Sequence, residues 1–218
     1  MKKTVLTILS VLCSFSAYAQ DASTDNMQIQ AAIDACIAMR DAAAAGDTTA
    51  LRLSASNLKA AGTTAFTSLR CKDDSIASLN GHLVFDHAFA DSLAAGSDIY
   101  SRADIMSRTT AHRGQTADGS ILTKTCFVRA GKSTKWTFAS KGHQELAVVA
   151  EAGGLVTMKI RVTNSAGLDR RYDDTKQVKK GLPQRKTAFE LPKDHRNQVE
   201  LEIINCGKKD CSFVVISN

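Results

Sequence analysis

Hydrophobic residues recur at helical spacing in the first half of the chain. Ile29, Ile33, Cys36 and Ile37 follow the pattern i, i+4, i+7, i+8, so they share one face of a helix that extends to Ala45. Since a glycine often ends a helix and a polar residue often begins the next one, the sequence GDTT at 46–49 indicates a break between two helices.

A second helix is predicted directly after this break, with Leu51, Ala55 and Leu58 on one face and Gly62 at its end. Together the two segments predict an antiparallel helical hairpin. A third helix is predicted over 82–96. Residues 113–120, RGQTADGS, read as a linker.

The period changes to two after residue 121. Trp136 and Phe138 share one face of their segment, and Val156, Met158 and Ile160 share one face of theirs. Alternation of this kind predicts strands with one apolar face each, packed as an antiparallel β-sandwich. The seven predicted strands are 121–128, 133–140, 144–152, 155–163, 186–192, 198–204 and 211–217.

These elements predict an α+β protein in which a helical region is followed by an antiparallel, jelly-roll-like β-sandwich. The expected divisions are a signal peptide at 1–19, a helical domain at 20–120 and a β-sandwich domain at 121–218.

The sandwich region resembles a bacterial pre-peptidase C-terminal domain or a related carbohydrate-binding-type jelly roll. The resemblance is carried by TCFVRAGKSTKWTFAS at 125–140, AEAGGLVTMKIRV at 150–162 and VELEIINCGKKDCSFVVIS at 199–217. It implies a non-catalytic module that assists secretion, adhesion or substrate targeting. No protease or hydrolase pattern precedes this module, so the resemblance extends to the fold and not to an accessory role.

The N-terminus has the pattern of a secretory signal peptide. Lys2 and Lys3 precede an apolar run that is too short to span a bilayer, and Ala17-Tyr18-Ala19 forms a small-x-small cleavage site. We therefore expect an exported protein, periplasmic, cell-surface or secreted, that begins at Gln20.

Five of the six cysteines follow the predicted signal peptide, and in an exported chain they favour disulfides over redox or metal roles, with one thiol left free or paired between molecules. The sequence CGKKDC is interpreted as a disulfide-closed β-hairpin that joins Cys206 to Cys211. Cys36 with Cys71 is the preferred second bridge, because both lie in the helical region. Cys126 lies within a predicted strand, where a buried thiol is more common than a nucleophile.

Charge is distributed unevenly along the chain. Residues 20–121 contain 8 Lys and Arg against 12 acids, a net charge of −4, whereas residues 122–218 contain 18 against 10, a net charge of +8. Two interpretations fit this difference: the two halves attract each other or merely differ in their solvated faces, or the basic half meets a polyanion.

The most suggestive stretch for binding is the basic segment 170–186, predicted as a long loop on the sandwich. Its arginine and tyrosine side chains are suited to hydrogen bonding and stacking on sugars. A solubilising insertion is the alternative interpretation. The candidate ligand-binding residues are Arg170, Arg171, Tyr172, Lys179, Lys180, Arg185 and, on a neighbouring strand, Trp136.

Patterns for catalysis, metals and cofactors are weak. Gly131-Lys132-Ser133 matches the end of a phosphate-binding loop, but Cys126 occupies the leading glycine position. His82 and His87 are five residues apart and diverge on a helix, so they do not form a chelating pair. We therefore expect no enzyme activity, no metal and no cofactor.

Three Asp-Ser/Thr-apolar sequences resemble a bacterial O-glycosylation signal, with acceptors at Thr48, Ser75 and Ser92. The function favoured by the sequence is a non-catalytic cell-envelope protein that binds a glycan or other polymer through the sandwich. The alternative is a structural or interaction protein whose ligand is a partner protein, and an accessory to a hydrolase is third. Nucleic acid is not expected as a partner, and no membrane span is expected.

Overall fold

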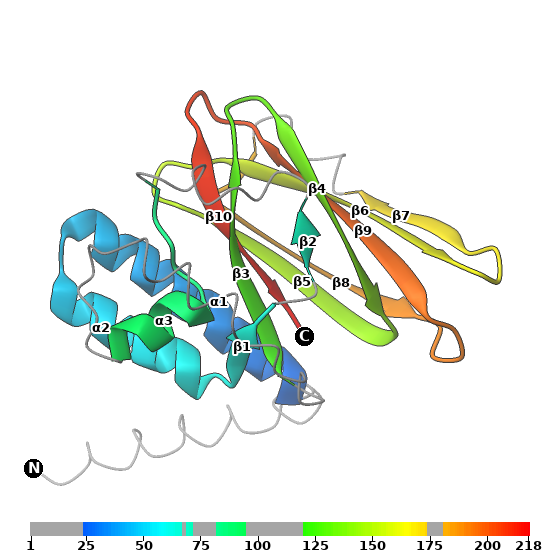
Figure 1. Cartoon of the computed structure of the whole chain (residues 1–218), viewed down its shortest axis with the longest axis horizontal. Helices are drawn as coiled ribbons and strands as arrows, with labels where there is room; N and C mark the ends of the chain where they lie inside the picture. The colour runs from blue at the N-terminus through cyan, green and yellow to red at the C-terminus, as the bar shows by residue number, and fades with distance from the viewer. Residues whose placement is uncertain (1–23, 67–68, 72–81, 95–119, 174–180) are drawn as a thin grey trace, which may run out of the picture.

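The computed structural model describes residues 24–66, 69–71, 82–94, 120–173 and 181–218, which form a helical layer packed on a β-sandwich (Figure 1). The helices are α1 (Thr24–Ala45), α2 (Thr48–Ala60) and α3 (His87–Ala94). The strands are β1 (Thr63–Ala65), β2 (Arg70–Cys71), β3 (Ile121–Val128), β4 (Ser133–Ser140), β5 (Gly142–Ala150), β6 (Val156–Asn164), β7 (Asp169–Asp173), β8 (Gln184–Leu191), β9 (Asn197–Asn205) and β10 (Cys211–Ser217).

The predicted helical hairpin is confirmed. Gly46, with φ of +69°, ends α1, and the Asp47 carboxylate begins α2 by accepting a hydrogen bond from the Ala50 backbone N–H at 2.9 Å. The third helix is shorter than predicted. It begins at His87 because the Asp86 carboxylate accepts a hydrogen bond from the Phe89 N–H at 3.1 Å and so caps it.

The strands from β3 onward form two antiparallel sheets with jelly-roll connectivity. Sheet A has the order β1-β3-β10-β5-β8, and sheet B has the order β2-β4-β9-β6-β7. From β3 to β10, the chain crosses to the other sheet after every strand except β6, which pairs with β7. This wrapping of strands between two packed sheets confirms the predicted jelly-roll-like sandwich.

Sheet A has apolar residues on both faces, in contrast to the expectation of one apolar face per strand. Val148 and Val215 face the space between the sheets, whereas Val149 and Val214 face the helices. Both faces are covered, so β10 is buried along its whole length.

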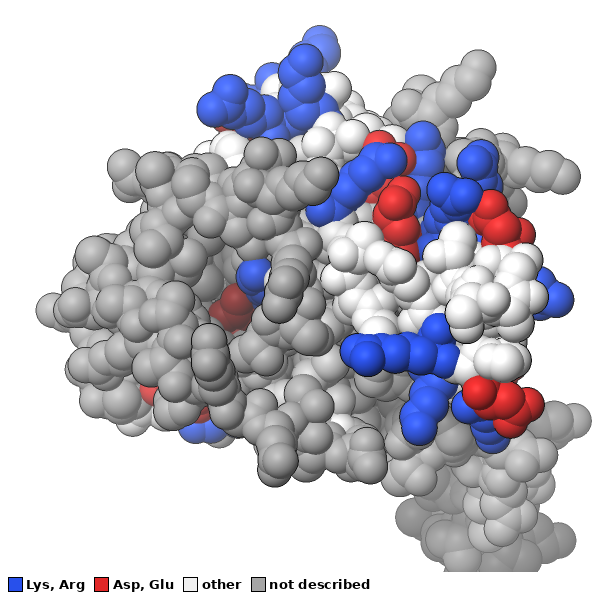
Figure 2. Space-filling view, turned by 45° about the vertical axis from the view of Figure 1, so that its right-hand side comes forward, with Lys and Arg blue, Asp and Glu red and all other residues white. Residues whose placement is uncertain are grey.

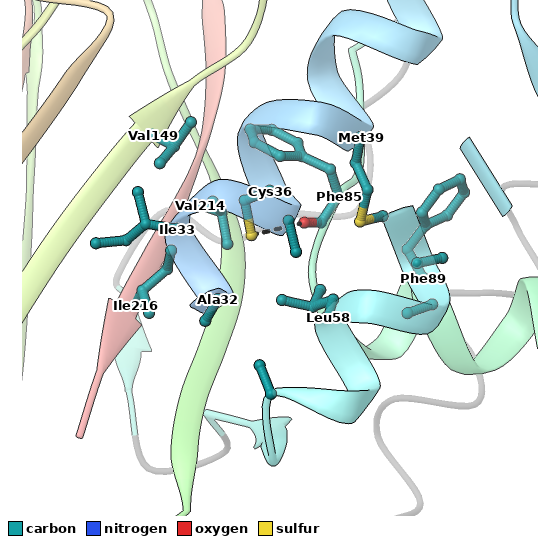
Figure 3. Packing of buried hydrophobic residues seen from close by; sticks show 14 of the residues in the cluster. Ala32, Ile33, Cys36, Met39, Leu58, Phe85, Phe89, Val149, Val214 and Ile216 are labelled. Carbon is teal, nitrogen blue, oxygen red and sulfur yellow. Dashed lines mark hydrogen bonds between the residues drawn. The ribbon is translucent and has the colours of Figure 1, made fainter. Parts of the chain in front are cut away.

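The helical layer and sheet A share a hydrophobic core (Figure 3). Ile33 of α1 lies beside Val149 and Ile216 of sheet A, and Met39, further along α1, points toward Phe89 of α3 in the same cluster. In addition, β1 pairs in parallel with β3, and β2 pairs with β4. The predicted boundary at residue 121 therefore does not divide the hydrophobic core.

The interpretation of CGKKDC as a β-hairpin is wrong. Cys206 follows β9 of sheet B and Cys211 begins β10 of sheet A, so the segment between them crosses from one sheet to the other. Both are free thiols, and the predicted bridge between them is not formed. Alternation on both sides of a turn does not show whether two strands belong to one sheet.

The predicted bridge from Cys36 to Cys71 is not formed either, because Cys36 is a free thiol. Its Sγ lies 3.6 Å from the Phe85 carbonyl oxygen, within the core between helices and sheet (Figure 3). Burial raises the pKa of Cys36, with a smaller contribution from the charge of Asp86. Cys126 is completely buried, in agreement with its interpretation as a core residue.

Candidate functional site

The outer face of sheet B bears a groove lined by charged side chains, here named the sheet B groove. Its volume is about 270 Å³, and no helix of the described residues covers it. Figure 2, which brings the β7 side of the sandwich forward, shows Lys and Arg side chains intermixed with Asp and Glu. The groove is lined by Lys135, Lys159, Ile160, Arg161, Arg171, Glu200 and Glu202.

Strand register places these charges on one face. Arg161 of β6 lies opposite Glu200 of β9 on one side and opposite Arg171 of β7 on the other. Lys159 lies opposite Glu202 in the same way. Because paired residues of neighbouring strands point to the same side of a sheet, all five side chains project outward.

Most bases of the groove already have acidic partners. Arg161 donates two hydrogen bonds to the Asp169 carboxylate, at 2.9 and 2.7 Å, and these bonds lower the pKa of Asp169. Lys135 lies 3.4 Å from Glu200. Arg171 differs, since it forms no ion pair with another residue that the structure describes.

The predicted ligand-binding residues do not lie together. Arg171 lines the groove, but Arg170 lies opposite the buried Val162 and so projects from the other face of β7. The ring of Tyr172 stacks on Phe189 with centroids 4.6 Å apart and closes the edge of the sandwich. Lys179 and Lys180 lie outside the described residues.

Two of the predicted ligand residues are buried. The side chain of Trp136 is 1 % exposed and packs edge-on against Phe213, with centroids 5.5 Å apart, between the two sheets, so the folded protein does not present it to a ligand. Arg185 is 8 % exposed and lies in β8 of sheet A, away from the groove. The sequence placed Arg185 in the predicted loop at 170–186, whereas it placed Trp136 with Phe138 on the apolar face of a strand, the face that a sandwich buries.

A second polar cluster joins residues far apart in sequence, and the sequence analysis missed it. The Glu151 carboxylate lies 2.8 Å from His82 Nδ1, and it accepts hydrogen bonds from the backbone N–H groups of Ser212 at 2.9 Å and Leu83 at 3.3 Å. The Ser212 hydroxyl donates to the Leu83 carbonyl, so it is not poised as a nucleophile. This cluster fastens the segment before α3 to the sandwich.

Cys211 lies beside this cluster, and its environment opposes nucleophilic chemistry. Burial, followed by the negative charge of Glu151, raises the pKa of the Cys211 thiol to about 12. A thiol with this pKa stays protonated at neutral pH, whereas cysteine nucleophiles react as thiolates.

A third cluster surrounds His143 on β5. Its Nδ1 lies 2.6 Å from Glu190 and its Nε2 lies 3.2 Å from the buried Glu145, which also pairs with Lys186 at 3.0 Å. The hydrogen bond with Glu190 and then that with Glu145 raise the pKa of His143.

This arrangement makes a prediction about pH. A raised folded-state pKa means that the stabilisation by His143 is fully present below its unfolded pKa of about 6.5 and is lost as the pH rises through the folded pKa. Because the side chain of His143 is 42 % exposed, we expect it to contribute less than about 1 kcal/mol to the free energy of unfolding. In urea unfolding, the free energy of unfolding of the wild type should exceed that of His143→Gln most near pH 5, and the two values should converge near pH 9. If the difference in the free energy of unfolding between the two proteins is the same at every pH, protonation of His143 does not stabilise the fold.

The predicted glycosylation sites differ in accessibility. Thr48 is exposed at the first residue of α2 and stays a prediction. Ser92 is buried and donates a hydrogen bond to the Ala88 carbonyl, so the folded protein does not present it to a modifying enzyme. Ser75 lies outside the described residues.

Within the described residues, no group of three or more His, Cys, Asp or Glu side chains is arranged to hold a metal ion. Among the same residues, no helix is long and apolar enough to cross a membrane.

No protein-family model matches the chain, and no curated protein matches it. The resemblance to a pre-peptidase C-terminal domain is therefore not confirmed. Similar solved structures include the Yersinia pseudotuberculosis-derived mitogen, which is 12 % identical over 45 % of this chain and 85 % of its own, with a TM-score of 0.33.

Two further solved structures are similar at the same low level. The carbohydrate-binding module TmCBM61, determined in complex with β-1,4-galactotriose, is 9 % identical over 45 % of this chain and 81 % of its own, with a TM-score of 0.27. Aeromonas hydrophila PliG, a periplasmic inhibitor of g-type lysozyme, is 12 % identical over 48 % of this chain and 93 % of its own, also with a TM-score of 0.27. Likenesses this slight do not assign a function, and the jelly-roll description rests on the strand order of this chain.

Proposed function

We propose that this chain is an exported, non-catalytic binding protein that holds an acidic glycan or a similar anionic polymer in the sheet B groove. The observation that carries the proposal is the position of Arg171. Its guanidinium lines an open groove and forms no ion pair with a described residue, so it can donate hydrogen bonds to a carboxylate, sulfate or phosphate group.

The balance of charge in the groove supports an acidic ligand. Four bases line the groove against two glutamates on the central strand β9, and Asp169 pairs with Arg161, so the bases exceed the acids by the charge of Arg171. Glutamate oxygens also accept hydrogen bonds from hydroxyl groups, which a sugar polymer supplies at each unit. A polymer with both acids and hydroxyls therefore suits this surface.

The lining residues also bear on the mode of recognition. No aromatic side chain of the described residues lines the groove, so they supply no platform for stacking on a neutral sugar ring. Recognition by charge and hydrogen bonds predicts binding that weakens as salt is added. Export is supported by the signal-peptide pattern at the N-terminus.

We expect Arg171→Gln to weaken binding of an anionic polysaccharide about tenfold, because it removes a charge-assisted hydrogen-bonding group. The measurement is retardation of the purified protein in gels that contain anionic or neutral polysaccharides, at low and high salt. Arg52→Gln, a matched change at an exposed position of α2, should leave retardation unchanged.

Three results would overturn the proposal. Equal losses in the two arginine variants would show a general charge effect and not a site. Retardation by a neutral glycan that is insensitive to salt would place the ligand elsewhere. If no polysaccharide retards the protein, a partner protein becomes the better candidate for the ligand.

A further inference from the structure

Four exposed bases meet at one end of the sandwich, where two loops lie side by side. These loops are the β3–β4 turn at 129–132 and the β9–β10 loop at 206–210, and both lie at the upper end of the molecule in Figure 1. Figure 2 shows Lys and Arg side chains gathered at this end. The four bases, named here the loop-end patch, are Arg129, Lys132, Lys208 and Lys209.

Asn205, which is completely buried, holds the two loops together. Its side-chain amide donates hydrogen bonds to the carbonyls of Val128 at 3.2 Å and Lys209 at 2.8 Å, and its carbonyl oxygen accepts one from the Gly207 N–H at 2.8 Å. The backbone N–H of Asn205 donates to the Lys132 carbonyl at 3.0 Å. The backbones that carry the bases are therefore fixed relative to each other before any ligand arrives.

The patch has an excess of positive charge that is not neutralised locally. Asp210 is the acidic residue of the two loops, and its carboxylate accepts a hydrogen bond from the Ala130 N–H at 2.9 Å. None of the four bases forms an ion pair with another residue in the part of the chain that the structure describes. They differ in this respect from Lys135 and Arg161 of the sheet B groove, which are paired with acids.

We propose that the loop-end patch docks the protein on an anionic phospholipid surface. The bases lie at the tips of two loops that project from the sandwich, a shape that meets a flat surface and does not enclose a polymer chain. Among the described residues, neither loop exposes a large hydrophobic side chain, and the exposed Leu182 lies beside the β9–β10 loop, where its neighbour Gly181 packs against Cys206. Docking therefore rests on the charges of the loop-end patch, and it acts in addition to the binding proposed for the groove.

The test is co-sedimentation of the purified protein with vesicles of phosphatidylcholine alone or of phosphatidylcholine mixed with phosphatidylglycerol. We expect binding to the mixed vesicles that is lost at high salt, and no binding to phosphatidylcholine. Each base near an anionic surface strengthens binding about fivefold, so the double variant Lys208→Gln/Lys209→Gln should bind about 25-fold more weakly.

The matched control removes the same charge from the opposite end of the sandwich. Lys141 lies in the β4–β5 turn and Lys193 in the β8–β9 loop, and both are exposed. The double variant Lys141→Gln/Lys193→Gln should keep vesicle binding within about twofold of the wild type, since these bases lie far from the docked surface. Arg171→Gln should also leave vesicle binding unchanged, which separates this proposal from the proposed function.

Absence of binding to anionic vesicles by the wild-type protein would overturn the proposal. So would equal losses in the two double lysine variants, because net charge and not the loop-end patch would then explain binding. If the Lys208/Lys209 variant instead loses retardation by a soluble acidic polysaccharide while the wild type ignores vesicles, the patch binds a polymer and the lipid surface is excluded.

Discussion

Asn197→Asp is expected to destabilise the protein by about 3–5 kcal/mol, close to the cost of leaving a buried charge without a partner. Asn197 is the first residue of β9, and its side chain is completely buried. Its amide nitrogen lies within hydrogen-bonding distance of three backbone carbonyls, those of Ser140 at 3.2 Å, Pro192 at 2.9 Å and His195 at 3.1 Å.

The side-chain carbonyl of Asn197 is also engaged, since it accepts a hydrogen bond from the Asn164 amide at 3.0 Å. One side chain thus joins the end of β4, the loop before β9 and the end of β6. An ionised aspartate has no donor, so it would set a negative charge against three carbonyl oxygens that lose their partner. Loss of the Asn197 hydrogen bonds should therefore loosen the end of β4, the loop before β9 and the end of β6 together.

Urea unfolding at neutral pH is the measurement, with Gln198→Glu as the control. Gln198 is the next residue of β9, is exposed, and undergoes the same amide-to-acid change, so its effect should stay within about 0.5 kcal/mol. If the two variants are equally stable, water or a shifted loop replaces the donors, and Asn197 does not hold this end together.

The strands were the part of the fold most accessible from the sequence. The predicted segments 121–128, 133–140 and 211–217 coincide with β3, β4 and β10, because alternating apolar positions reflect burial on one face. The strand β7 was missed since its residues, DRRYD, are mostly charged, and it lies at the edge of sheet B, where one side needs no partner strand.

What the sequence could not provide was the assignment of strands to sheets. Two well-predicted strands on either side of CGKKDC belong to different sheets, and nothing in their alternation distinguishes a hairpin from a crossing. The continuous apolar runs LAVVA in β5 and FVVI in β10 did contain a signal for burial on both faces. That signal would have predicted the helical layer packed on sheet A.

In the candidate site, the sequence also did not show which side chains lie on the same face of a sheet. Arg170 and Arg171 are adjacent in sequence, and a loop would let both reach one ligand. In a strand, adjacent side chains point to opposite faces, so only Arg171 joins the groove. Lys135, Lys159 and Arg161 come from other strands, and only the register between β4, β9, β6 and β7 brings them together.

Trp136→Ala is expected to destabilise the protein by about 3–5 kcal/mol, because it empties a large volume between two sheets that pack closely. The indole is 1 % exposed and lies edge-on to Phe213. Its Nε1 has no hydrogen-bond partner in the part of the chain that the structure describes, so we expect Trp136→Phe to break no hydrogen bond and to cost only about 1–2 kcal/mol.

The phenylalanine variant also separates a structural role of Trp136 from a binding role. Since the ring lies in the core, Trp136→Phe should be retarded by an anionic polysaccharide to the same extent as the wild type, although it unfolds at lower urea concentration. Loss of retardation at unchanged stability would mean that the indole reaches the ligand, which requires the sheets to open at β4. Retained retardation leaves charge and hydrogen bonding on the outer face of sheet B as the means of recognition, consistent with a groove whose described lining residues include no aromatic ring.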